Sequence, residues 1–376
     1  MEVHVSAVNA FSIAGIRIRI DHSWFIAFFL FAWTLSFGYF PLQVPDYPSF
    51  TYWSAGTISA LGLFACVLLH ELSHCFVARR LGVEVRQITL FIFGGVSEMA
   101  QASSSTPSAE FRTTIAGPLA SLGLGLLFAA VAYVVRSSVD RMLLEIIHYL
   151  YYVNFLLAAF NLIPGFPLDG GRVLRSYLWH RTGNLRQATK SAARVGEIFA
   201  IALMALGVIS ALAMHIIPGV WLILIGLFLK NSAENEYRSF ELRFGLKNMK
   251  LREIMTPPIA VNTSMTISQF VNDYVFHYHY RVFPVLELNR FIGMIDVRSI
   301  KRVPPNDWPT TSIGAYLSDP STYWVLNPDM DATDALHVLM SRDCSKAPIV
   351  RNGTLMGILT RSDLFKLISL KRDIAA

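Results

Sequence analysis

His70, Glu71 and His74 form the sequence HELSH, a spacing that lets one helix present two histidines to a single metal ion. On an α-helix these histidines lie one turn apart on the same face, so both imidazoles can bind the same ion. Glu71 projects beside that face, where it can take a proton from a bound water. The pattern is short and also arises by chance. Here it lies in an almost wholly apolar run, residues 55–78, where ionisable groups are costly and usually functional.

A second informative string, residues 161–172, reads NLIPGFPLDGGR. Its two prolines and three glycines interrupt helical hydrogen bonding, which is tolerated at membrane depth only where protein or a wet cavity shields the backbone. Asp169 could complete a His/His/carboxylate zinc site with its fourth position left for water. Asn161 could donate its amide to a developing oxyanion. Alone, the string is typical of a helix cap and turn at a membrane exit; beside HELSH it favours a metal site.

The elements that carry these residues are expected to span a membrane. The 376 residues are 53% hydrophobic and 15% charged, and the mean hydropathy of +0.45 excludes an ordinary soluble protein. The net charge of +6 fits loops at the inner leaflet better than nucleic-acid binding. Lys and Arg gather on one side of the spans, which predicts that both termini are cytoplasmic. The expected spans are residues 24–40, 55–78, 111–135, 143–163, 195–214 and 220–229.

Residues 81–101 differ from the spans, because β-branched residues roughly alternate there and Gly94-Gly95 breaks the run. This pattern predicts a short hairpin. An unpaired strand edge there could accept an extended peptide by β-addition. A surface hairpin without a ligand fits these residues nearly as well.

The three cysteines, Cys66, Cys75 and Cys344, suggest no disulfide framework. Cys66 shares a face with His70, but it is too far from an ion held between the two histidines to form a thiolate bond. We expect Cys66 to be a packing residue.

Beyond about residue 230 the charge density rises to that of a soluble domain, reached through a connector at residues 231–250. Two similar units follow, residues 251–306 and 307–376, each with strand, helix, hairpin and helix character. They resemble a tandem pair of cystathionine-β-synthase (CBS) domains, which commonly bind adenine nucleotides. The resemblance places the ribose-binding aspartate at Asp363, with Thr360 nearby, whereas the first unit has Ser299 at the matching position. A purely structural or dimerising pair fits equally well.

HELSH followed by N-x-x-P-x-x-P-L-D-G, with Ala116-Gly117-Pro118 between them, resembles the site-2 protease family of intramembrane zinc metalloproteases. The resemblance implies one Zn²⁺ per chain, Glu71 as general base and Asn161 as a polar group over the scissile carbonyl. The implied zinc ligands are His70, His74 and Asp169. Many relatives carry a PDZ domain between the motifs. This chain has no room for one and is more similar to the compact branch with a C-terminal regulatory module.

The fold expected is therefore a polytopic α-helical membrane domain, residues 1–230, with about six transmembrane helices and a short β-hairpin, followed by a soluble α+β tandem CBS module. The expected function is hydrolysis of membrane segments in regulated intramembrane proteolysis. The substrate would be locally unwound and held near Gly94 and Gly95. ATP, ADP or AMP at the CBS pair could modulate it, and the pair could form a homodimer.

Two other functions compete with proteolysis. A transporter or channel gated by its CBS pair could use the His/Glu/Asp cluster as an ion path, but transporters usually show a repeat of spans that this sequence lacks. A catalytically dead scaffold would be favoured only if a ligand or Glu71 were missing, and all are present. The substrate itself is not encoded in any recognisable pattern.

Overall fold

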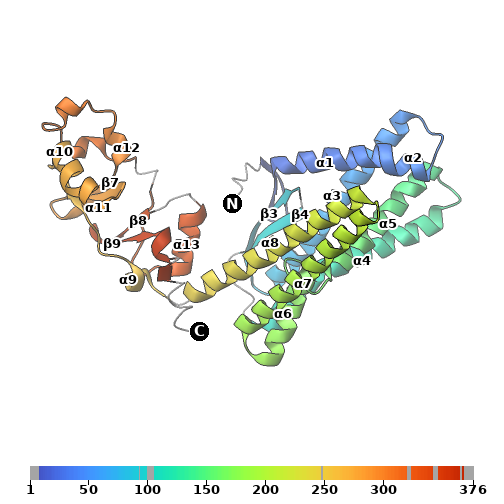
Figure 1. The fold of residues 1–376 in the computed structure, drawn as a ribbon. Coiled ribbons are helices and arrows are strands. Elements are labelled where there is room, and N and C mark those ends of the chain that lie inside the picture. Colours follow the sequence, from blue (N-terminus) through green and yellow to red (C-terminus); the bar gives the residue numbers. More distant parts are fainter. Residues whose placement is uncertain are drawn as a thin grey trace. The chain divides into compact units, whose positions relative to one another are not determined.

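The computed structural model describes residues 8–92, 94–99, 106–246, 249–319, 323–341, 346–364 and 366–367. The chain divides into two compact units, Met1–Arg238 and Ser239–Ala376. The first is mainly helical and the second mixes short helices with small sheets (Figure 1). Each unit is described by itself.

Six helical segments in the described part of the chain are long and apolar enough to cross a membrane, as predicted. The first combines α1 (His22–Thr34), a π-helical turn η1 (Leu35–Tyr39) and α2 (Phe40–Gln43). The others are α3 (Ser49–Arg80), α4 (Pro107–Val135), α5 (Arg141–Asn161), α7 (Leu185–Leu212) and α8 (Ile216–Leu246).

A four-stranded sheet packs against the C-terminal half of α3. Its strands, in the order β1-β2-β3-β4, are β1 (Val8–Ile13), β2 (Ile16–Ile20), β3 (Val85–Phe91) and β4 (Gly94–Met99). The hairpin prediction is confirmed by the antiparallel pairing of β3 with β4. The sequence analysis missed β1 and β2. Ile16 and Ile18 are fully buried in a cluster with Leu72 and Cys75 of α3, so the sheet is fixed to the helix that carries HELSH.

The string after α5 forms a tight loop that leads into a short helix, α6 (Asp169–Thr182), which begins at Asp169. The loop lies against α7 so closely that a Cβ atom on Gly165 would be 2.5 Å from the Cα of Gly196. Glycine is required at both positions because the two backbones touch there. This backbone contact fixes the loop, and with it the start of α6, against α7.

The prediction of a short last span at residues 220–229 is wrong, because α8 runs for 31 residues. Pro218 lies in its first turn, where the missing N–H of proline has no helical partner to lose. Beyond the apolar part, Glu234 forms ion pairs one turn away with Lys230 and Arg238, at 3.9 and 3.6 Å. Pairs of this spacing support helix in a polar stretch. Much of the expected connector is therefore a continuation of α8.

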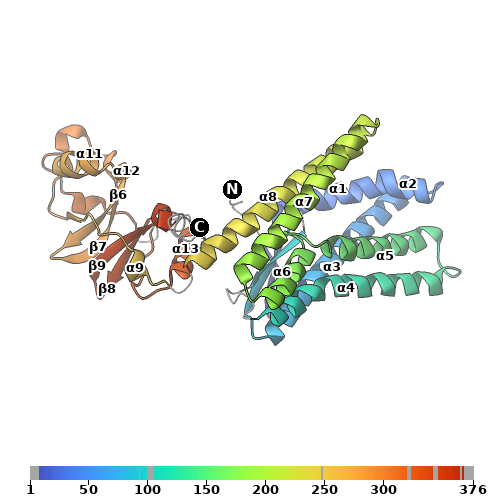
Figure 2. The same cartoon turned by 60° about the horizontal axis from the view of Figure 1, so that its bottom comes forward.

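The second unit has the α+β architecture predicted for a CBS pair. Figure 2 shows its hairpins, β6 (Val282–Glu287) with β7 (Arg290–Asp296) and β8 (Lys346–Arg351) with β9 (Thr354–Thr360). The short strand β5 (Val261–Asn262) adds to β6 in parallel. The remaining elements are α9 (Leu251–Ile254), α10 (Ile267–Gln269), η2 (Phe270–Val275), α11 (Phe276–Tyr278), α12 (Val297–Ile300), η3 (Pro305–Asp307), η4 (Ile313–Tyr316) and α13 (Ala332–Ser341).

The two repeats exchange their leading segments. Leu251, at the start of the first repeat, is buried in the core of the second with Leu326 and Ile349. Ile313, at the start of the second repeat, is buried in the core of the first with Phe270. Each core therefore needs chain from both repeats, and the second unit folds as one body.

Candidate metal centre and active site

Three side chains meet between α3 and the start of α6. His70 Nε2 lies 3.2 Å from His74 Nε2, and Asp169 Oδ2 lies 3.1 and 3.2 Å from these two nitrogens. Both histidines are buried, with 4% and 5% of their surface exposed. Among the described residues this is the group of three metal-ligating side chains close enough to share an ion.

The donor set and its spacing fit zinc. Tetrahedral zinc with bonds of about 2.0–2.1 Å separates its ligand atoms by about 3.3 Å, close to the three distances found here. Gly117 of α4 lies over the two imidazoles, where a Cβ atom would be 2.2 Å from His74 Nε2 and 2.6 Å from His70 Nε2. The absence of a side chain at Gly117 therefore leaves open the space into which both nitrogens point.

The side of α4 that faces α3 fixes the orientation of the two imidazole rings. His74 Nδ1 lies 2.8 Å from the carbonyl oxygen of Thr113, which can only accept, so this nitrogen carries the proton. His70 Nδ1 lies 2.9 Å from Ser121 Oγ. With Nδ1 as the donor, each Nε2 keeps its lone pair for a metal. The sequence analysis missed the contacts that Thr113 and Ser121 make with the two histidines.

Glu71 is left free of the metal-ligand group and lies under β4. A Cβ atom on Gly95 would be 2.5 Å from Glu71 Cγ and 3.4 Å from Glu71 Oε1. The strand backbone therefore touches the Glu71 side chain, and only glycine allows this approach. Gly94, with a φ of +131°, precedes it at the turn. The other edge of β4 has no partner strand in the described part of the chain.

Asn161 is the last residue of α5, just before the loop to Asp169. Its Nδ2 donates to the carbonyl oxygen of Leu157 at 3.0 Å, within its own helix. One amide proton is therefore engaged, while a second and the amide oxygen remain. Its assignment to the oxyanion stays a prediction.

A buried ion pair joins α6 to α4. Arg175 donates from Nε to Glu110 Oε1 at 2.7 Å and also from Nη2 to the same oxygen. Its guanidinium carbon also lies 5.2 Å from the ring centre of Phe166, three residues before Asp169. The sequence analysis singled out neither Glu110 nor Arg175.

The cysteines agree with a packing role. Cys66 and Cys75 are buried thiols outside any disulfide in the described part of the chain, and neither belongs to the metal-ligand group. Cys344 lies outside the described residues.

Comparison with known proteins decides the family. The model of peptidase family M50 matches residues 58–139 and 133–205. Rip3 of Mycobacterium tuberculosis is 34% identical over 364 residues, which cover 96% of this chain and 92% of Rip3. This chain belongs to peptidase family M50, the site-2 protease family. Zinc metalloprotease MJ0392 of Methanocaldococcus jannaschii is 33% identical over 309 residues, covering 82% of this chain and 84% of that protein.

The CBS domain model matches residues 251–306 and 320–370, so this M50 protein carries two CBS domains. Among solved structures, the site-2 protease from Methanocaldococcus jannaschii aligns with a TM-score of 0.43 at 32% identity. The alignment covers 61% of this chain and 95% of that one. Membership of a family of zinc metalloproteases makes zinc the metal implied for the His70–His74–Asp169 group.

In the CBS pair of this M50 protein, Thr360 and Asp363 lie together at the end of β9. Thr360 Oγ1 donates to Asp363 Oδ2 at 2.7 Å. Lys346, missed by the sequence analysis, is the cross-strand partner of Thr360, and its Nζ lies 4.5 Å from the ring centre of Tyr280. Burial lowers the pKa of Lys346, while the Asp363 carboxylate acts in the opposite direction.

The first CBS repeat is arranged differently at the matching positions. Asp296 takes the place of Thr360, and Arg281 and Arg298 both pair with its carboxylate, at 3.3 and 2.9 Å. Ser299, in place of Asp363, follows on α12. The carboxylate of the first repeat is thus already engaged by two arginines of its own chain.

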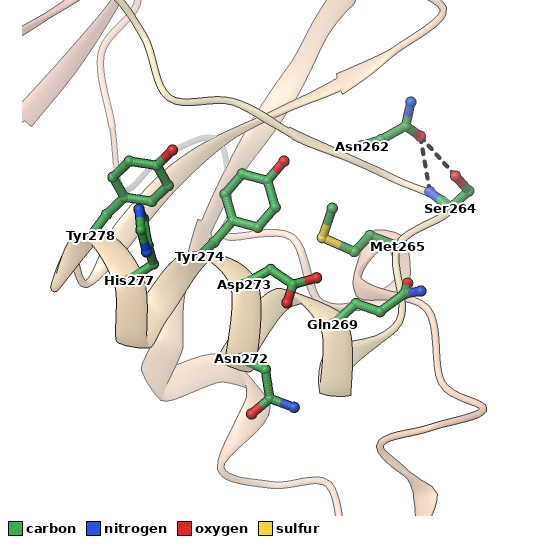
Figure 3. A pocket seen from close by; sticks show the side chains of 9 residues that line it. All are labelled: Asn262, Ser264, Met265, Gln269, Asn272, Asp273, Tyr274, His277 and Tyr278. Atoms are coloured by element: carbon green, nitrogen blue, oxygen red, sulfur yellow. Dashed lines mark hydrogen bonds between the residues drawn. The ribbon is translucent and has the colours of Figure 1, made fainter.

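A cavity of about 700 Å³ opens on the first CBS repeat. Its polar wall includes Asn262, Gln269, Asp273 and His277, as Figure 3 shows, and Ser264 Oγ donates to Asn262 Oδ1 at 3.0 Å. Its lining comes from the first repeat alone, so Thr360 and Asp363 take no part in it.

Proposed function

We propose that this protein hydrolyses peptide bonds in membrane-spanning segments of other proteins, within regulated intramembrane proteolysis. The observation that carries the proposal is the convergence of His70, His74 and Asp169 beside Glu71, which stays outside that group. The two histidines and Glu71 lie on α3, a helix long and apolar enough to span a membrane. An intact ligand set with a free carboxylate next to it suits hydrolysis better than an ion path, which has no need of a separate base.

In this mechanism His70, His74 and Asp169 would hold the zinc ion through Nε2, Nε2 and a carboxylate oxygen. When bound, zinc supplies a water of lowered pKa and polarises a carbonyl group. Glu71 accepts a proton from the attacking water and later gives it to the leaving amine. Asn161 donates its remaining amide proton toward the oxygen that gains charge.

The substrate must reach this site as extended chain, because a helical peptide bond is shielded by its own hydrogen bonds. The open edge of β4 supports this, since its N–H and C=O groups can pair with an added strand. The contact between Gly95 and Glu71 places that strand directly beside the general base. We propose that the substrate strand pairs with β4, with Gly94 and Gly95 leaving room for it.

Replacing Glu71 by glutamine tests the function directly. The amide cannot carry the proton, so Glu71→Gln should bind one zinc ion per chain and lose cleavage of a panel of single-span membrane proteins reconstituted with the purified protease. Glu84→Gln, which alters an exposed carboxylate beyond the end of α3, is the matched control and should cleave normally. Undiminished cleavage by Glu71→Gln would refute the assignment.

The membrane topology proposed with this function places both termini in the cytoplasm, because Lys and Arg gather at the ends of the spans on one side. The arginines that close α3, Arg79 and Arg80, are among them. Labelling of single cysteines placed near each terminus, in sealed cells and in lysed ones, would establish it.

As a second function, we propose that one adenine nucleotide binds at the second CBS repeat and modulates proteolysis. The arrangement of Lys346, Thr360 and Asp363 supports it: a cationic group faces two polar groups across one strand pair, which suits a phosphate and a ribose. The occupied carboxylate of Asp296 supports a single site. A homodimer formed through the CBS pair belongs to the same proposal.

Titration of the full-length protein with ATP, ADP and AMP, with binding and cleavage measured together, tests this function. Asp363→Ala should abolish binding and make the rate insensitive to nucleotide. Ser299→Ala, the matched change in the first repeat, should leave both unchanged. A coupling between nucleotide and protease typically amounts to about 5- to 150-fold. Binding without any change in rate would leave the pair as a dimerisation module, and the absence of binding would refute nucleotide control.

A further inference from the structure

The ion pair between Glu110 and Arg175 is buried between α4 and α6, the helix that begins at Asp169. The Glu110 side chain is 3% exposed and that of Arg175 is 13% exposed. Two N–H groups of one planar guanidinium reach one carboxylate oxygen. Such a contact fixes direction as well as distance, which a lysine could not do.

Glu110 lies on the face of α4 that orients the two histidines. It precedes Thr113, whose carbonyl holds His74, by about one turn, and Gly117 and Ser121 follow at further turns. All four residues are buried along this face. The contact of Arg175 with Glu110 therefore fixes α6 relative to the same face of α4 that orients both imidazoles.

Arg175 also touches the chain on the other side of Asp169. It belongs to α6, which starts at Asp169, while its guanidinium lies over Phe166 in the preceding loop. Phe166 is itself 2% exposed and packs against Ala192 and Ala193 of α7. One side chain thus links α4, the loop and α6 around the third ligand.

We propose that Arg175 and Glu110 are positioning residues for the metal centre, which hold Asp169 Oδ2 at bonding distance from the ion. Metal–ligand distances tolerate only about 0.2 Å, so a small shift of α6 against α4 would remove the third ligand. The proposal rests on the zinc site of the proposed function, but not on the substrate or on cleavage.

The test measures zinc affinity by competition with chelators, and thermal unfolding of the metal-free protein, on the full-length chain. Glu110→Gln and Arg175→Gln should each weaken zinc binding by about 10- to 100-fold, the range known for residues that orient metal ligands. Arg175→Lys keeps the positive charge but loses the two guanidinium N–H bonds to Glu110. Its zinc affinity should lie between those of the wild type and Arg175→Gln. Tyr39→Phe removes a 2.7 Å hydrogen bond to Glu145 far from the ligands, and should lower the melting temperature while zinc affinity is kept.

The double variant Glu110→Gln/Arg175→Gln separates positioning from plain stabilisation. Each single variant leaves one buried charge unpaired, so the neutral double variant should regain stability. Its zinc affinity should stay low, because nothing then holds α6 and Asp169 in place against α4. Recovery of zinc affinity together with stability, or wild-type affinity in the single variants, would overturn the proposal. If either single variant fails to fold, Arg175→Lys and the double variant decide. Failure of the wild-type protein to bind zinc would instead refute the metal centre itself.

Discussion

Replacing Gly117 by alanine adds one carbon atom at the point where the two imidazoles converge. That carbon would lie 2.2 Å from His74 Nε2 and 2.6 Å from His70 Nε2. Ordinary contacts between such atoms are about 3.5–4.0 Å, so each ring would have to retreat by about 1 Å. This displacement is about five times the tolerance of a metal–ligand distance, roughly 0.2 Å.

The backbone of α4 itself should accept the change, because alanine is favoured over glycine in a helix by about 1 kcal/mol. Gly123 on the same helix has no atom within 4 Å of an added Cβ and provides the matched control. Gly123→Ala should keep full zinc occupancy and an equal or higher melting temperature. Gly117→Ala should lose zinc binding by at least about 100-fold, beyond the usual effect of a residue that only orients a ligand.

Zinc per chain would be measured by mass spectrometry after dialysis against chelators of increasing strength, with thermal unfolding of the metal-free forms alongside. The metal-free Gly117→Ala protein should remain folded, so that loss of zinc cannot be ascribed to unfolding. If Gly117→Ala retained zinc like Gly123→Ala, the rings would be able to move aside without cost. The inference that Gly117 keeps the ligand space open would then be wrong.

Asp169→Ala should retain less zinc than wild type after mild chelation, since two imidazoles and solvent are left to hold the ion; metal content equal to wild type would remove Asp169 from the ligand set. The loop between α2 and α3 should loosen in acid. The Tyr47 hydroxyl donates to Asp140 and holds the pKa of that carboxylate below its usual 3.8. The contact therefore stabilises the fold above that pH and is lost as pH falls through the lowered value. Hydrogen exchange of residues 44–48 against pH, with Tyr47→Phe as the control that lacks the dependence, would reveal it.

The pairing of His70 with His74 could be predicted because its information is local. His70 and His74 are one helical turn apart, and any helix through them must bring both rings to one side. Asp169 was identified from its Pro- and Gly-broken surroundings, which are unusual between apolar spans. The structure brings all three together within hydrogen-bonding distance.

Contacts between distant parts of the chain could not be predicted in this way. Arg17 and Arg19 alternate with isoleucines, which is typical of a strand. This strand pairs with its neighbour β1, but its second partner is β3, about seventy residues later. Glu110 and Arg175 are separated by 65 residues, and each alone reads as a charged flank of a span. Asn161 differs, because the contact that could not be predicted is a local one. Its side-chain amide donates to the carbonyl oxygen of Leu157 in its own helix, which composition does not reveal.

The length of α8 also escaped the sequence analysis, because composition changes near residue 230 while the helix does not. Polar residues with pairs such as Lys230–Glu234 continue a helix as readily as apolar ones when the spacing is right. A composition boundary therefore marks where the surroundings of a helix change, and the helix can extend well past it.

The helix α8 contributes residues to a hydrophobic cluster of the first unit and to the core of the second. Ala233 and Tyr237, past the end of its apolar stretch, pack in the cluster that holds Phe166, and Leu246 at its end is buried in the core of the second CBS repeat. A protease shortened at residue 230, where hydropathy suggests a clean cut, would lose the cover over Phe166 and weaken the support of Asp169. The boundary that respects the fold lies after Arg238.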